Sequence, residues 1–123
     1  MGVDVTVEYL ILEYAKEVYK QGENSISDEN YDLAFKFFKQ SFYSSLRYIL
    51  DTDDSLSLTD LYDKSCLLGI SLNTAKVRAF ISLVSDLSTL PLDDILYLKE
   101  IAFSYLNFAK KLNAIQPKLE TFV

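Results

Sequence analysis

Hydrophobic and polar positions alternate at helical spacing along most of the chain, and most regularly between residues 29 and 51. One set of apolar residues recurs every three or four positions, which places its members on a single helix face: Ala34, Phe38, Phe42, Leu46 and Ile49. A second set widens that face: Leu33, Phe37 and Tyr48. The stripe left over is narrow and polar: Asp32, Lys36, Gln40, Tyr43 and Arg47. A helix that is apolar over most of its circumference is surrounded by other helices, so we expect residues 29–51 to form the centre of a bundle.

The same spacing predicts four more helices, over residues 3–21, 58–68, 74–88 and 92–115. The alternating run at residues 3–7 is too short to predict a strand. The sequence therefore predicts an all-α fold, an up-and-down bundle of four long helices plus one short helix.

Glycine, serine and proline predict where the helices begin and end. Gly22 stands where a helix favours a left-handed closing residue, so residues 22–28 are predicted to form a loop. Ser27 or Asp28 would then cap the central helix. Ser57 is predicted to cap the short helix, and Pro91 marks the start of the last one. The short helix would face inward through its apolar and small residues: Leu61, Tyr62, Ser65 and Leu68.

Length and composition agree with one helical domain. The chain has 123 residues, 50% of them hydrophobic, which is enough for a core without disulfides or metals. Three glycines and two prolines are too few for a fold rich in tight turns. We expect residues 1–123 to form one domain and residues 116–123 to form a flexible tail.

Charge and hydropathy exclude several partners. The net charge is −6 with no basic cluster, which argues against nucleic-acid binding through phosphates. No apolar stretch approaches the ~20 residues that span a bilayer, and the first residues lack the pattern of a signal peptide. We therefore expect a cytoplasmic protein without membrane contact.

Histidine, a side chain on which many enzymes rely, is missing. Without histidine the chain lacks the usual general base near neutral pH and the commonest metal ligand. Cys66 has no histidine partner and is predicted to be a small buried hydrophobe. The acidic run at residues 51–54 lacks the central glycine and distal glutamate of a calcium loop. We predict no catalytic residue, no metal and no cofactor.

Polar residues in apolar surroundings are the remaining candidates for binding. Arg47 follows two serines on the central helix, and Arg78 stands beside Val77 on the fourth. Each arginine could cover apolar surface with its stem, or form an ion pair or ligand contact at a helix interface. Tyr43 joins them as a candidate contact to a ligand or partner. The chain has nine tyrosines and eight phenylalanines, and any that the core does not use would favour a dimer surface.

The central segment YDLAFKFFKQSFYSSLRYIL resembles the second helix of HEPN domains. That helix follows the phrase A-x-x-x-x-x-Q-A-x-x-x-x-L-K-x-x-L, and comparable places here are held by Ala34, Gln40, Ser41, Leu46, Arg47 and Leu50. A short helix and a helix pair follow in HEPN proteins, as they are predicted to do here. The resemblance covers about residues 5–115.

The resemblance implies a helical bundle that dimerises and lacks ribonuclease activity. HEPN ribonucleases carry an arginine followed, after four to six residues, by a histidine. The corresponding positions after Arg47 are threonine and two aspartates, and those after Arg78 are leucine, valine and serine. Other HEPN proteins are non-catalytic partners of nucleotidyltransferases, so the resemblance implies a homodimer that partners a nucleotidyltransferase-like or other protein.

Two alternatives stay open at this point. The protein could be a ribonuclease of a toxin–antitoxin or defence system, with an unconventional site built on Arg47 or Arg78 together with tyrosine or aspartate. It could also be a generic helical adaptor that is unrelated to HEPN domains.

Overall fold

Five helices make up the fold. The computed structural model describes residues 5–52, 56–69 and 75–115, with side chains from Leu10 onward. The helices are α1 (Val5–Ser27), α2 (Tyr31–Leu50), α3 (Leu58–Leu67), α4 (Ala75–Asp86) and α5 (Leu92–Ile115). No strand occurs within these ranges, so the prediction of an all-α fold is confirmed.

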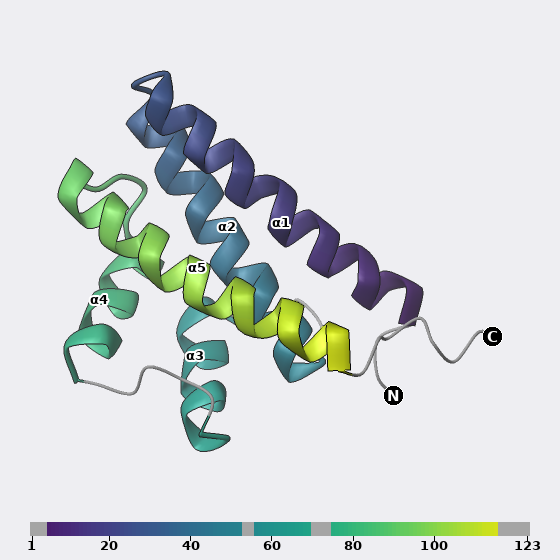
Figure 1. Cartoon of the computed structure of the whole chain (residues 1–123). Helices are drawn as coiled ribbons and strands as arrows, with labels where there is room; N and C mark the ends of the chain where they lie inside the picture. The colour runs from purple at the N-terminus through teal and green to yellow at the C-terminus, as the bar shows by residue number, and fades with distance from the viewer. Residues whose placement is uncertain (1–4, 53–55, 70–74, 116–123) are drawn as a thin grey trace.

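The central position of α2 is confirmed as well. Figure 1 shows α1 and α2 side by side in opposite directions, α5 along α2, and the shorter α3 and α4 away from α1. Helix α2 packs against α1, α5 and α3. Its buried side chains include the predicted face and Tyr48: Ala34, Phe35, Phe38, Ser41, Phe42, Ser44, Ser45, Leu46, Tyr48 and Ile49. The Tyr48 hydroxyl donates to Asn113 Oδ1 at 2.8 Å, which ties α2 to the end of α5.

The end predicted for the first helix is wrong. Helix α1 continues through Gly22 to Ser27, so most of the predicted loop is helical. Gly22 is required for packing here, because a Cβ at this position would lie 2.7 Å from Cε1 of Phe38. The missing side chain therefore lets α2 approach α1 closely.

The turn between α1 and α2 is tight and uses residues other than those predicted. Glu29 adopts a left-handed conformation with φ of 59°. Asn30 caps α2 in place of Ser27 or Asp28, since its side chain accepts a hydrogen bond from the Leu33 amide at 3.3 Å. An asparagine at this position satisfies one of the free amides of the first turn.

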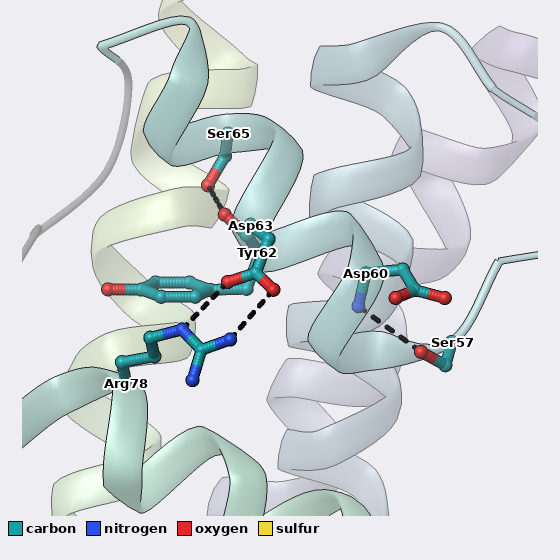
Figure 2. A network of polar contacts seen from close by, with 6 residues as sticks. All are labelled: Ser57, Asp60, Tyr62, Asp63, Ser65 and Arg78. Carbon is teal, nitrogen blue, oxygen red and sulfur yellow. Dashed lines mark hydrogen bonds and ion pairs between the residues drawn. The ribbon is translucent and has the colours of Figure 1, made fainter.

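Helix α3 begins as predicted but faces the core over a shorter length. Ser57 accepts a hydrogen bond from the Asp60 amide at 3.2 Å, as Figure 2 shows. Leu61 and Ser65 are buried as predicted. Leu68 is 66% exposed, because α3 ends at Leu67 and the chain turns away. Cys66 is half-buried rather than buried, and it packs against the edge of the core.

Helix α5 has the predicted bounds. The Asp94 and Ile95 amides donate to the Pro91 carbonyl at 3.0 Å, which starts the helix where proline forbids continuation from α4. The predicted tail, the connector at residues 70–74 and the acidic residues Asp53 and Asp54 lie outside the described residues.

Candidate functional site

The polar stripe of α2 forms the floor of a groove of about 540 Å³, which we call the α2 groove. Three other helices supply its walls: Tyr14 comes from α1, Leu58 from the start of α3, and Ser85 from α4. The residues from α2 are Lys36, Lys39, Gln40, Tyr43, Ser44 and Arg47. Four of the five residues of the predicted polar stripe line the groove, and the fifth, Asp32, lies outside it.

The charge of the α2 groove is opposite in sign to that of the chain. Its lining includes three cations, Lys36, Lys39 and Arg47, and none of the described lining residues is acidic. The chain as a whole carries a net charge of −6. The groove therefore offers a local positive potential on an acidic protein, which favours anionic groups.

Arg47 carries hydrogen-bonding capacity that the protein does not fully use. The side chain is half-buried, and its guanidinium carbon lies 6.0 Å from the centre of the Tyr43 ring. Its buried Nε has no hydrogen-bond partner among the described residues. A guanidinium has five N–H donors and prefers to use them on carboxylates or phosphates. Arg47 is therefore the residue of the groove best suited to hold an anion.

Lys39 has a structural role as well as a charge. Its ammonium donates to the carbonyl oxygens of Ser85 and Leu87, each at 3.4 Å, and so connects α2 to the end of α4. The ammonium also lies 5.6 Å from the centre of the Phe35 ring. Burial lowers the pKa of Lys39, and the nearby Asp86 acts in the opposite direction. The charge of Lys39 thus adds to the positive potential of the groove, and its hydrogen bonds hold α2 against the end of α4.

Two tyrosines are held in place on the two sides of Gln40. The Tyr14 hydroxyl donates to Gln40 Oε1 at 3.1 Å, which bridges α1 and α2 across the groove. The Tyr43 hydroxyl donates to the Leu56 carbonyl at 2.9 Å. Both hydrogen bonds fix ring positions, so the groove has defined aromatic walls instead of freely rotating side chains.

Arg78 lies outside the α2 groove. Figure 2 shows its guanidinium against the Asp63 carboxylate, to which Nε and Nη2 each donate at 3.0 Å. The hydrogen bonds that Arg78 donates to Asp63, and then the charge of Asp63, raise the pKa of Arg78. This exposed bidentate pair joins α4 to α3 and occupies the donors that a ligand would need.

The structure thus brings together two of the three predicted contacts, Arg47 and Tyr43, and separates Arg78 from them. It adds Lys36, Lys39 and Tyr14, which sequence reasoning did not select. Lys36 and Arg47 share the predicted polar stripe, so their common face was a signal that could have selected Lys36. Nothing in the sequence places Tyr14 opposite Gln40.

Comparison of the chain with family models, with curated proteins and with solved structures found no match. Within the described residues, no group of three or more histidine, cysteine or acidic side chains could hold a metal ion. None of the helices in the described ranges has the length and hydropathy to cross a bilayer. The α2 groove is therefore the candidate functional site.

Proposed function

We propose that this protein is a non-catalytic helical binding protein, and that the α2 groove is where it holds another molecule. The observation that carries the proposal is the charge of the groove, whose described lining residues include three cations and no acid on a chain that is acidic overall. Such a site attracts and orients an anionic group. Its described lining residues include no carboxylate and no imidazole, the groups that most often transfer protons near neutral pH.

Two features argue against the ribonuclease alternative. The chain has no histidine, so the proton-transfer role in RNA cleavage would fall to another side chain. Arg78 is already held by Asp63 in a bidentate pair, and Arg47 faces a groove without a described carboxylate that could act as a base. Ligand binding is therefore the better account of Arg47, and an ion pair between α4 and α3 accounts for Arg78.

The proposal includes the finer predictions drawn from the HEPN resemblance. These are the HEPN-like, up-and-down arrangement of four long helices and one short one, a homodimer, and a partner of the nucleotidyltransferase type or another protein. We also propose a cytoplasmic location. The helices α1, α2 and α5 have 23, 20 and 24 residues, and α4 has 12, which makes α4 the weakest match to that arrangement.

An RNA-cleavage assay separates binding from catalysis. Purified protein is incubated with RNA alongside Arg47→Ala, Arg78→Ala and a control, Lys110→Ala, which removes an exposed charge outside the groove. We expect no cleavage above the buffer in any sample. Cleavage by the unmodified protein that persists in Lys110→Ala but is lost in either arginine variant would overturn the proposal.

The generic adaptor differs from a HEPN-like protein in its expected partner. A nucleotidyltransferase encoded by a neighbouring gene, and binding of that protein in a titration, would favour the HEPN-like assignment. Binding only to proteins of other kinds would favour the adaptor.

A further inference from the structure

We propose that the α2 groove binds an acidic helical segment of a partner protein, whose carboxylates pair with Lys36 and Arg47. This inference rests on the proposed function, because it assigns the class of molecule that the binding groove accepts. It commits to a peptide from a different protein as the occupant.

The spacing of the cations sets the length of the occupant. Lys36 and Arg47 are eleven residues apart on α2, which corresponds to about 16 Å along the helix axis. An occupant that places one anionic group against each cation, with both side chains standing out from α2, carries its charges at two places along its length.

A helix lying along α2 meets this requirement directly. It has the same rise per residue as α2, so acidic residues about eleven positions apart would reach both cations. Acidic residues three or four positions apart would share one face with them and widen the charged strip. Tyr14, Tyr43 and Leu58 line the groove as well, and they offer apolar contact to the aliphatic parts of such a helix.

Charge density favours a peptide over a nucleic-acid strand. A nucleic acid carries a charge on every nucleotide, so most of its phosphates would find no cation in the groove and would face a chain of net charge −6. A peptide, in contrast, can carry carboxylates at the positions that face the cations and uncharged residues everywhere else. Arg47 adds specificity, because a planar guanidinium binds a carboxylate through two parallel hydrogen bonds.

A second copy of the chain is a weaker candidate for the occupant. A two-fold symmetric contact through this face would set two cationic grooves against each other, and their like charges would repel. If an acidic segment of a second copy occupied the groove, self-association would depend on Lys36 and would weaken in Lys36→Gln.

The test uses synthetic peptides as probes. The first is an Ala-rich, fluorescein-labelled helix of about 18 residues with glutamates placed to face Lys36 and Arg47. The second has the same composition, with its glutamates moved next to one another. Fluorescence anisotropy of the full chain with each peptide is measured at low and moderate salt. We expect the spaced peptide to bind about five times more tightly than the rearranged one, since only its carboxylates reach both cations.

Variants of the chain locate the binding. Arg47→Gln is expected to weaken binding of the spaced peptide about tenfold, because it loses a charge-assisted pair. Lys36→Gln is expected to weaken it about threefold, since Lys36 is exposed and its pair is screened. Lys110→Gln removes the same charge from α5, outside the groove, and should bind as the unmodified protein does. If Arg47→Gln fails to fold by circular dichroism, Lys36→Glu serves in its place.

Several results would overturn the inference. Equal binding of the two peptides would show that affinity does not depend on the spacing of the carboxylates. Equal binding by Lys36→Gln and Lys110→Gln would show that Lys36 does not contact the peptide. Displacement of the peptide by a uridine oligonucleotide that binds more tightly would assign the groove to nucleic acid, and displacement by inorganic phosphate would assign it to a small anion. Self-association that is lost in Lys36→Gln would assign it to a second copy. Each result leaves the RNA-cleavage test unaffected, so failure here is distinct from failure of the proposed function.

Discussion

At the scale of single residues, two serines on α2 differ only in their hydrogen bonds. Ser41 and Ser45 are both fully buried. The Ser41 hydroxyl donates to the Ala15 carbonyl at 2.8 Å and thereby connects α2 to α1. The Ser45 hydroxyl has no hydrogen-bond partner within the part of the chain that the structure describes. A buried hydroxyl without a partner costs free energy, whereas a paired one contributes to stability.

Substitution of each serine by alanine should therefore have opposite effects. Ser41→Ala is expected to lower the free energy of unfolding by about 1 kcal/mol, because it removes the hydrogen bond between α2 and α1. Ser45→Ala should leave that free energy unchanged or raise it by up to about 1 kcal/mol. Urea denaturation followed by circular dichroism measures both. A larger loss in Ser45→Ala than in Ser41→Ala would contradict this account.

Tyr19 makes stability depend on pH in the alkaline range. Its ring lies 5.3 Å from that of Phe38, and burial, followed by the charge of Glu23, raises the pKa of Tyr19 to about 12. The unfolded chain has a tyrosine pKa near ~10, so between these values the unfolded state loses a proton that the folded state keeps. Stability is therefore fully present below pH ~10 and falls as the pH rises toward about 12.

The prediction is a loss of about 1–2 kcal/mol from this residue between pH ~10 and pH ~12. Thermal or urea unfolding across that range measures it. Tyr19→Phe keeps the ring and removes the titrating hydroxyl, so its stability should fall less steeply with pH. Burial also raises the pKa of Tyr48, which acts in the same direction and remains in the variant. Equal slopes for the two proteins would contradict the assignment to Tyr19.

At the scale of helices, the packing of α1 on α2 depends on Gly22. A Cβ at this position would lie 2.7 Å from Cε1 of Phe38, and Phe38 is itself fully buried. Gly22→Ala gains up to about 1 kcal/mol of helix propensity but costs about 1–3 kcal/mol through overpacking. We expect a net loss of about 1 kcal/mol in the free energy of unfolding.

A double-mutant cycle identifies the cause. In a Phe38→Leu background the ring is gone, so Gly22→Ala should become neutral or stabilising. Urea unfolding of the four proteins gives the coupling between the two positions. A loss from Gly22→Ala of equal size in both backgrounds would show that contact with Phe38 is not the reason for the glycine.

Gly22 also shows what the sequence of α1 and α2 could not reveal. A glycine near a helix end favours a cap on local grounds, and only the position of Phe38 on another helix gives it a different role. Some signals that act within one helix were read correctly, as for Pro91 at the start of α5 and Ser57 at the start of α3. The Asn30 cap of α2 was missed although it is local, and so were the signals that depend on a second helix.

In the candidate site, too, the features set by one helix were predicted and those set by a second helix were not. The polar stripe of α2 was predicted because its residues share one helix face, and it does form the floor of the α2 groove. The walls come from α1, α3 and α4, whose approach to that stripe is set by packing of the core. Nothing in the sequence separated Arg78 from Arg47. The carboxylate that pairs with Arg78 belongs to Asp63, which lies on another helix.

At the scale of the whole molecule, α5 carries an exposed apolar strip suited to the proposed homodimer. Leu92, Leu96 and Phe103 share one face of α5 and are 37%, 38% and 47% exposed. Lys99 lies between the last two, and its ammonium is 3.6 Å from a carboxylate oxygen of Glu23, which offsets its charge. A strip of this kind favours contact with another apolar surface, and a second copy would supply the same strip.

We therefore expect a dimer by light scattering at ~100 μM, and a shift to monomer in Phe103→Glu, because a charge within the strip would be buried without a partner. Leu67→Glu is the matched control, since Leu67 is 86% exposed on α3, away from the strip. That variant should stay dimeric. A monomeric unmodified protein would refute the dimer, and dissociation by Leu67→Glu instead of Phe103→Glu would move the interface from α5 to α3. Because Lys36 lies outside the strip, Lys36→Gln should leave the dimer intact, which keeps dimerisation and occupation of the α2 groove separable by experiment.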